Sequence, residues 1–221
     1  MTDREYARAE FLNRSGWGDA ELASMGQDAS TRSYLRLSGP QGRAILMDAP
    51  PAHESAPCGP EASEYERILA GWNARTRLAA CRVDAFVGIG EFLVNLELSA
   101  PRTYAYDVEQ GFAVIEDLGD GIYAREIENG ADERTLYLAA TDCLTCIHQQ
   151  SAPESVTAGD WVWPVQHYDR LAMTTGADLF PKWYPSYDAG VSFSGELARR
   201  YDDVVGGLSA HLASLRPVLM M

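Results

Sequence analysis

Alternation of apolar and polar positions is clearest in the first half of the chain, where it predicts short strands. An amphipathic stretch over residues 3–14 comes first and predicts a helix. The expected strands cover residues 21–25, 33–37, 43–47, 103–106 and 112–115. Short polar or Gly/Pro-rich turns separate neighbouring strands, as at Ser38–Gly42. We therefore predict one antiparallel sheet of five strands.

Apolar spacing near 3.6 residues dominates the remainder and predicts helices. The expected helices cover residues 61–80, 84–98, 122–128, 132–150, 168–180 and 194–215. Asp84 is positioned to cap the second of them. Residues 151–166 are expected to be loop, residues 182–187 a turn-rich aromatic stretch, and 217–221 the start of a buried strand. The chain is thus predicted to be α+β, with strands mostly before helices.

Two of these helices carry apolar stripes that we expect to face a core. In the helix over 61–80 the stripe is Tyr65, Ile68, Leu69, Trp72 and Leu78. In the helix over 132–150 it is Leu136, Ala139, Ala140, Cys143, Leu144 and Ile147. Cys143 and Cys146 form a CxxC pair in the middle of that helix, without a second pair nearby. We interpret them as small core residues, not as a metal or redox site.

Charge excludes some classes of partner. The formal net charge is −14, so the chain lacks the clustered Lys and Arg that nucleic acid or an anionic membrane surface requires. Lys182 is the single lysine among 18 basic side chains, and no Walker A motif is present.

The N-terminus and the hydropathy of the chain favour a cytoplasmic location. A signal peptide begins with a basic region followed by an apolar run, and residues 1–5 show neither feature. No apolar run approaches the roughly 20 residues that span a bilayer. The four cysteines are accordingly expected to be reduced thiols.

Residues Gly111–Gly119 form the joint between the strand-rich and helical parts. An apolar, β-rich run ends there in Glu116, Asp117, Leu118 and Gly119. Such a segment predicts a buried strand that leaves its sheet at the acidic pair. It is expected to form one wall of a cleft.

Four segments in order resemble a known family. They are Asp28–Tyr34, Ile45–Pro51, Leu136–His148 and Leu179–Tyr184. With the joint at Glu116–Gly119 they are similar to the aminoglycoside phosphotransferase/choline kinase-like group, and most of all to its bacterial N-acetylmuramate/N-acetylglucosamine kinases. The resemblance covers nearly the whole chain.

This resemblance implies a protein-kinase-like fold, with a five-stranded N-lobe over 1–117 and an incomplete helical C-lobe over 118–221. It implies ATP with Mg²⁺ as cofactors, and transfer of the γ-phosphate to a hydroxyl of an amino sugar or aminoglycoside-like acceptor. The nucleotide-binding residues implied by the resemblance are Ser30, Thr31, Arg32, Ser33, Met47, Glu116, Asp117 and Leu118. Those implied for the acceptor are Asp178, Trp183 and Tyr184.

Each of these assignments has a simpler alternative. The segment around Ser30–Ser33 could cover phosphates with its N–H and O–H groups, or be a polar hairpin turn. The backbone of Glu116–Leu118 could bind adenine, or be a plain strand end. Asp178 could bind a sugar hydroxyl or be an ordinary solvated charge. Trp183 and Tyr184 could stack on a sugar or serve only in packing.

The first departure from the family pattern concerns the third strand. Protein kinases place a lysine there to hold phosphates, and this chain has Met47 and Asp48. Arg32 or Arg36 is the candidate replacement, and a solvated strand arginine is the alternative. In protein kinases a helix glutamate pairs with the third-strand lysine. Glu91 is the candidate for that glutamate here, and the alternative is that Glu91 is an ordinary surface acid.

The second departure concerns the catalytic loop, which in the family reads His-x-Asp-x-x-x-x-Asn. The one His-x-Asp here is His167–Tyr168–Asp169, and Thr174 stands where the Asn is required. We interpret this segment as the start of a substrate-side helix. The resemblance then places the catalytic base and metal ligands beyond Met221, so no catalytic or metal residue is assigned. The chain is expected to be inactive alone, as a fragment or as a pseudokinase that binds nucleotide without catalysis.

Overall fold

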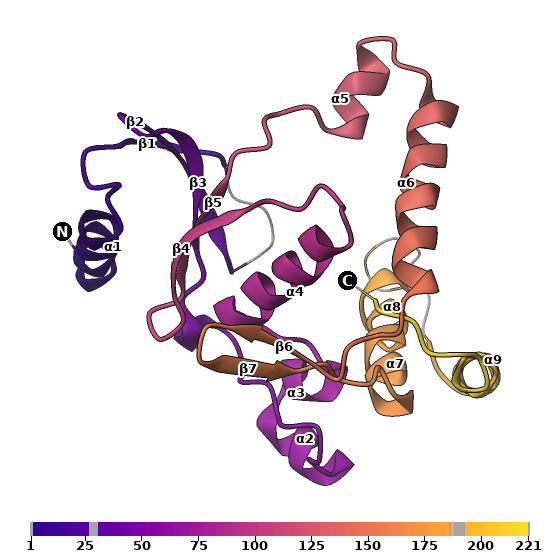
Figure 1. The fold of residues 1–221 in the computed structure, drawn as a ribbon. Coiled ribbons are helices and arrows are strands. Elements are labelled where there is room, and N and C mark those ends of the chain that lie inside the picture. Colours follow the sequence, from indigo (N-terminus) through magenta and orange to yellow (C-terminus); the bar gives the residue numbers. More distant parts are fainter. Residues whose placement is uncertain (1, 27–30, 186, 188–192, 221) are drawn as a thin grey trace. The chain divides into compact units, whose positions relative to one another are not determined.

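The computed structural model describes residues 2–26, 31–185, 187 and 193–220 (Figure 1). The chain forms two compact units. The first, here called the sheet unit, comprises Met1–Glu54, Cys81–Trp163 and Leu219–Met221. The second, the helical unit, comprises Ser55–Ala80 and Pro164–Val218. These units divide the chain elsewhere than at residue 117, and the two-lobe boundary stays a prediction.

An antiparallel sheet of five strands forms the centre of the sheet unit. The strands are β1 (Glu21–Ser24), β2 (Ser33–Gly39), β3 (Gly42–Asp48), β4 (Thr103–Asp107) and β5 (Phe112–Glu116). Their order is β1-β2-β3-β5-β4. A short 3₁₀ turn, η1 (Pro51–His53), follows β3. The α+β class and the five-stranded sheet predicted from alternation are confirmed.

Helix α1 (Asp3–Arg14) covers one face of this sheet (Figure 1). A capping box between Thr2 and Glu5 begins the helix, which buries Phe11 and Leu12. These side chains pack in one cluster with the inward residues of β2, β3 and β5, and the rings of Phe11 and Phe112 stack at 5.3 Å. Arg4 fixes the helix to the sheet, because its Nε donates to Asp48 at 2.9 Å and its guanidinium lies on Phe112.

Helix α4 (Val83–Asn95) and a hairpin cover part of the opposite face. The hairpin consists of β6 (Ser155–Ala158) and β7 (Trp161–Pro164). Residues 151–166 were expected to be loop, and this expectation is wrong. Val156 and Ala158 are buried, and β6 packs on α4, so tertiary contact stabilises strands too short to recognise by alternation.

The start of α4 also differs from the prediction. Asp84 does not cap the helix, because it lies inside its first turn and Arg82 occupies the capping position. Asp84 is fully buried, and its carboxylate accepts hydrogen bonds from Arg82 at 2.7 and 2.6 Å. The hydrogen bond to Asp84 raises the pKa of Arg82 above its ordinary value.

Helices α5 (Tyr123–Glu128) and α6 (Glu133–Gln149) complete the sheet unit. Asp132 caps α6 by accepting from the Thr135 N–H at 2.7 Å. The stripe expected to face a core is largely exposed, and Ile147 is its one fully buried member. The core assignment of Cys143 is therefore wrong, since this side chain is exposed, while Cys146 is half-buried.

The helical unit contains five helices among its described residues. They are α2 (Glu64–Ala70), α3 (Trp72–Thr76), α7 (Arg170–Ala177), α8 (Leu179–Tyr184) and α9 (Glu196–Ala213). The single helix expected over 61–80 is broken at Gly71, which has a φ of 112°. A Cβ at Gly71 would lie 2.9 Å from Cβ of Ser55, so both conformation and space require glycine. The stretch expected to be turn-rich begins inside α8.

Arg67 is the buried residue of α2, instead of the expected apolar stripe. Tyr65, Ile68 and Leu69 are exposed, whereas Arg67 is 1% exposed. Its guanidinium donates to the Asp169 carboxylate at 2.5 and 2.9 Å and to the Ala74 carbonyl at 3.1 Å. The guanidinium can be buried because its nitrogen atoms donate hydrogen bonds to these acceptors.

The last described residues do not form the strand expected from residue 217 onward, although Leu219 is buried. A strand needs backbone hydrogen bonds to a neighbouring strand, and an apolar run in the sequence does not specify that neighbour.

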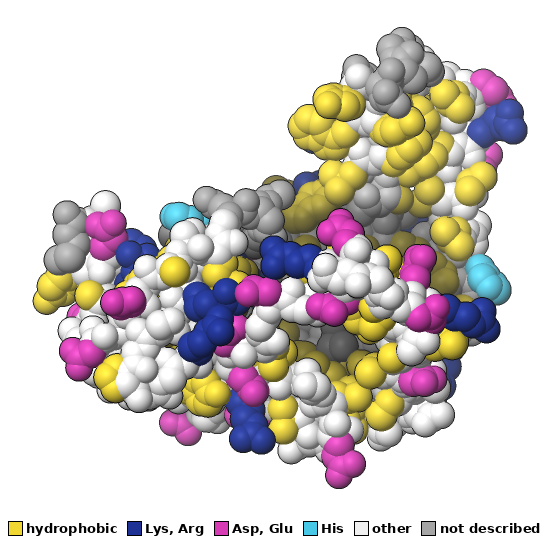
Figure 2. Space-filling view, turned by 90° about the horizontal axis from the view of Figure 1, so that it is seen from above, with side chains coloured by type: hydrophobic (Ala, Val, Ile, Leu, Met, Phe, Trp, Pro, Cys, Tyr) yellow, Lys and Arg dark blue, Asp and Glu magenta, His cyan; other side chains and the backbone are white. Residues whose placement is uncertain are grey.

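Hydrophobic side chains lie on the molecular face shown in Figure 2 among acidic and basic ones. Among the helices of the described ranges, none combines the length and apolarity needed to cross a membrane.

Candidate functional site

Strand register places a row of side chains across the sheet face opposite α1. Ala23 on β1 pairs with Arg36 on β2, which pairs with Ile45 on β3, which pairs with Ile115 on β5. Partners in register project to the same face, so these four side chains line up. A second row on this face contains Tyr34, Met47 and Ala113.

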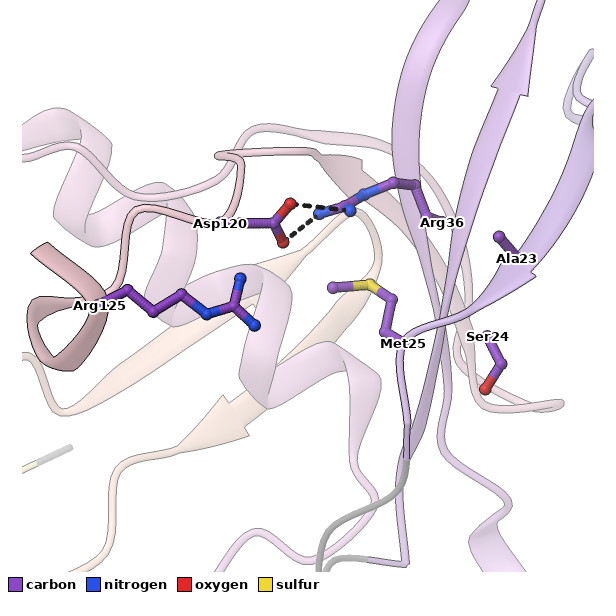
Figure 3. A pocket seen from close by; sticks show the side chains of 6 residues that line it. All are labelled: Ala23, Ser24, Met25, Arg36, Asp120 and Arg125. Carbon is purple, nitrogen blue, oxygen red and sulfur yellow. Dashed lines mark hydrogen bonds and ion pairs between the residues drawn. The ribbon is translucent and has the colours of Figure 1, made fainter. Parts of the chain in front are cut away.

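One end of this face is covered and the other is open. Val83 and Val87 of α4 and Ala158 of β6 pack with Ile45 and Met47 in a buried cluster. At the β1 end lies a pocket of about 310 Å³, lined by Ala23, Ser24, Met25, Arg36, Asp120 and Arg125 (Figure 3). This volume is at the lower end of the range for small-molecule sites.

Arg36 lies at the centre of the charged wall of this pocket. Its guanidinium donates to Asp120 in a bidentate pair at 3.1 and 2.8 Å (Figure 3). The hydrogen bond from Arg36 lowers the pKa of Asp120, and the same bond raises the pKa of Arg36, with burial opposing both changes. Arg125 projects from α5 toward this pair and favours the ionised form of Asp120 (Figure 3).

Asp117 connects the joint to two strands. Its side chain is 5% exposed, and its Oδ2 lies 2.9 Å from Arg36 Nε and 3.1 Å from Arg43 Nη2. The contact with Arg36 Nε lacks hydrogen-bond geometry, while Arg36 Nη2 donates to Asp117 Oδ1 at 3.3 Å. The joint is thus held against β2 and β3 by its acidic side chain, so the side chain is structural.

The backbone of the joint is unpaired at Asp117 and Leu118, shortly before the pocket residue Asp120. Asp117 Oδ1 accepts the Gly119 N–H at 3.0 Å, which turns the chain after the acidic pair. Within the described ranges no backbone hydrogen bond involves the N–H or C=O groups of Asp117 or Leu118. The N–H of Glu116, in contrast, donates to the Arg102 carbonyl at 2.8 Å. Residues 117 and 118 therefore retain donors and acceptors for a planar ligand.

The segment expected to cover phosphates is only partly described. Ser30 lies outside the described residues. The Thr31 hydroxyl donates to the Glu54 carboxylate and lies 3.4 Å from Cys81 Sγ. Arg32 is half-buried, and Ser33 begins β2 opposite Asp48. These positions bring the segment to the covered end of the site face, and the phosphate role of its residues stays a prediction.

The third strand shows what stands in place of a lysine. Met47 is 1% exposed and projects to the site face, whereas Asp48 projects to α1 and pairs with Arg4. The candidate Arg36 already contacts two carboxylates, so it is not a solvated arginine. Glu91 is exposed on α4.

The residues expected to bind the acceptor lie in the helical unit. Asp178 separates α7 from α8, and Trp183 and Tyr184 end α8 with more than half of each side chain exposed. The Tyr184 ring stacks on Phe180 at 5.1 Å, and the amine of Lys182 lies over the Trp183 ring. Their role toward an acceptor stays a prediction.

Asp169, which resembles a catalytic aspartate in sequence, has a structural role. Its carboxylate caps α7 by accepting from the Ala172 N–H at 3.0 Å and pairs with Arg67. Burial opposes ionisation, but these donors together lower the pKa of Asp169. The group is saturated with donors, which does not suit a general base.

Asp120 and Arg125 were missed at the level of sequence, as were Ala23 and Met25. Alternation over residues 21–25 could have placed Ala23 and Met25 on one face, but only the register with β2 brings Arg36 beside Ala23. The position of Asp120 directly after the joint was a weak sequence signal that it belongs to the site. Nothing local in the sequence indicates Arg125.

Metal ligands are a separate question. In the part of the chain that the structure describes, no group of three His, Cys, Asp or Glu side chains is placed to hold a metal ion. The described residues therefore do not fit a Mg²⁺ site of their own.

Bacterial sugar kinases are similar to this chain, although no protein-family model matches it. An N-acetylmuramate/N-acetylglucosamine kinase of Caulobacter vibrioides is 48% identical over 186 residues, which are 84% of this chain and 51% of that protein. Kinases of the same name from Pseudomonas aeruginosa and Pseudomonas putida are 29% and 27% identical, over 87% and 84% of this chain and 47% and 44% of their own length. The chain spans about half the length of these relatives.

Proposed function

Because the chain is homologous to bacterial N-acetylmuramate/N-acetylglucosamine kinases over about half of their length, we propose that its sheet unit binds ATP for phosphoryl transfer. The sheet, the joint and the helices after it then correspond to the nucleotide side of a protein-kinase-like fold, in the aminoglycoside phosphotransferase group. The observation that carries the proposal is the pocket around Arg36 and Asp120, together with the unpaired backbone of Asp117 and Leu118 shortly before Asp120 in the chain.

The residues around that pocket suit the parts of a nucleotide. Free backbone N–H and C=O groups at 117 and 118 can pair with the edge of adenine. Ala23 and Met25 offer apolar contact to the base or ribose. The guanidinium of Arg125 makes no hydrogen bond within the described ranges, so its N–H groups are available to a phosphate.

Phosphoryl transfer would need further groups. The acceptor is proposed to be an amino-sugar hydroxyl, as in the names of the relatives, with Asp178, Trp183 and Tyr184 as candidate contacts. ATP, when bound, would supply the phosphoryl group. Since Asp169 is committed to Arg67, no described residue is assigned as the base. We propose that this chain alone binds nucleotide without transferring phosphate.

Calorimetric titration of the chain with ATP tests the nucleotide site. We expect ATP to bind and GTP to bind more weakly, because the backbone pair at 117 and 118 matches adenine. Failure of ATP to bind, with and without Mg²⁺, would overturn the proposal. Binding that is independent of Mg²⁺ would favour a non-catalytic nucleotide-binding module.

Arg125→Ala is the sharpest variant, with Arg134→Ala on the exposed start of α6 as its control. We expect the first to weaken ATP binding about fivefold or more, at roughly 1 kcal/mol for a lost charged hydrogen bond, and to leave adenosine binding unchanged. Arg134→Ala should change neither. Equal effects of both variants would mean that overall charge, not the pocket, governs binding.

A parallel assay of phosphate transfer to N-acetylmuramate tests the expected inactivity.

A further inference from the structure

Helix α9 carries an apolar stripe that nothing in the described part of the helical unit covers. Leu197, Val204, Leu208 and Leu212 are 42% to 69% exposed. At 100° per residue these four positions fall within an arc of about 80°. An exposed row of large aliphatic side chains over more than four helical turns is unusual for a surface helix.

The packing of α9 leaves these four side chains open. The helix contacts α7 in the helical unit, and Ser209 is its buried residue, about 100° around the helix from Leu208. Tyr201 lies within the arc of the stripe and is its half-buried neighbour. It donates to the Ala177 carbonyl at 2.6 Å and packs against Phe193 at 5.3 Å. The stripe therefore adjoins the contact side of α9, which Figure 1 draws as the yellow helix seen nearly along its axis.

The spacing of the stripe fits a helix as its partner. Leu197, Tyr201, Val204, Leu208 and His211 alternate steps of four and three residues. This is the spacing with which one helix packs along another. It continues for only about two heptads, which is short for a stable coiled coil of two copies.

Comparison with the relatives offers one candidate for that partner. The matched 186 residues are 51% of the Caulobacter vibrioides kinase, so about half of that protein has no counterpart in the match. We propose that the α9 stripe is the docking surface for a polypeptide equivalent to this unmatched half. The proposal rests on homology and on the packing of α9, and does not depend on the nucleotide site.

Co-purification tests the interaction. The chain is co-expressed with a tagged polypeptide made of the Caulobacter vibrioides residues outside the match, and hydrogen exchange in α9 is measured. We expect co-purification and slower exchange along the stripe. Leu208→Glu should reduce retention about tenfold, because a carboxylate would be buried against apolar side chains. Ala210→Glu, at an exposed position on the opposite side of the same helix, should retain binding.

A single-chain format excludes failure of the separate segment to fold. The chain is joined to the same segment, and thermal unfolding is compared with and without Leu208→Glu. We expect the variant to lower the unfolding midpoint of the fusion by about 5 °C and to leave the chain alone within about 1 °C. Equal behaviour of Leu208→Glu and Ala210→Glu in the fusion, or no protection of α9 in either format, overturns the proposal. So does a homodimer of the chain alone that Leu208→Glu abolishes.

Discussion

The guanidinium of Arg36 on β2 lies 2.9 Å from the carboxylate of Asp117, which directly follows β5. Although β3 separates the two strands in the sheet, this contact joins its β1–β2 edge to the joint. Asp120 binds the same guanidinium from beyond the joint. One arginine therefore contacts both the joint, at Asp117, and the pocket wall, at Asp120.

Replacing Arg36 should loosen the joint more than replacing its neighbour Arg43. Both side chains contact Asp117, but Arg36 is 19% exposed and Arg43 is 59% exposed. Exposed ion pairs contribute little because water competes for both charges. We expect Arg36→Gln to lower the midpoint of thermal unfolding and to speed hydrogen exchange at residues 117–120. Arg43→Gln should cause a smaller change, and an equal change would argue against this role of Arg36.

The Arg36–Asp120 pair should lose its contribution to stability only in strong acid. The pKa of Asp120 is lowered in the folded protein by the hydrogen bond from Arg36. A lowered carboxyl pKa means that the contribution is fully present above the unfolded value of about 3.9, and is lost as pH falls through the folded value. Urea midpoints of wild type and Asp120→Asn should differ at about pH 7 and converge as the pH falls through the lowered pKa of Asp120. A difference that does not depend on pH would contradict this account.

Asp169 should matter for stability and not for catalysis. Removal of its carboxylate leaves the buried Arg67 guanidinium without a partner charge, which typically costs about 3–5 kcal/mol in a buried pair. Because Asp169 is 35% exposed, we expect the lower part of that range for Asp169→Ala, measured by urea unfolding. Glu196→Ala, which removes an exposed pair with Arg199, should change stability by less than about 0.5 kcal/mol.

The turn before β5 should tolerate no side chain at position 111. Gly111 has a φ of 74°, and a Cβ there would lie 2.1 Å from the Ala49 carbonyl oxygen. We expect Gly111→Ala to destabilise the protein by about 2–5 kcal/mol, through left-handed backbone strain and overpacking. Gly207→Ala in α9, with no atom within 4 Å of its Cβ, should instead be stabilising by up to about 1 kcal/mol. Chemical unfolding of both variants provides the comparison.

Alternation and turn residues were sufficient to predict the five strands, because burial of a sheet face and the turns between strands leave a local pattern. The same reasoning failed where local pattern and burial disagree. Arg67 is inside and Tyr65 outside on α2, because Asp169, about a hundred residues further along the chain, provides the acceptor. The hairpin of β6 and β7 is stabilised by packing against α4, and the sequence of residues 151–166 does not indicate that contact.

The candidate site divides in the same way. The sequence by itself indicated the joint at Glu116–Leu118 and the strands around it, because an apolar run that breaks into acids and glycine reflects local backbone requirements. Only the tertiary structure decided that Arg36, Asp120 and Arg125 meet at one pocket, that Asp117 is a structural side chain, and that Asp169 is bound to Arg67. Ion pairs between distant segments depend on strand register and helix packing, and these are properties of the folded chain that no local pattern encodes.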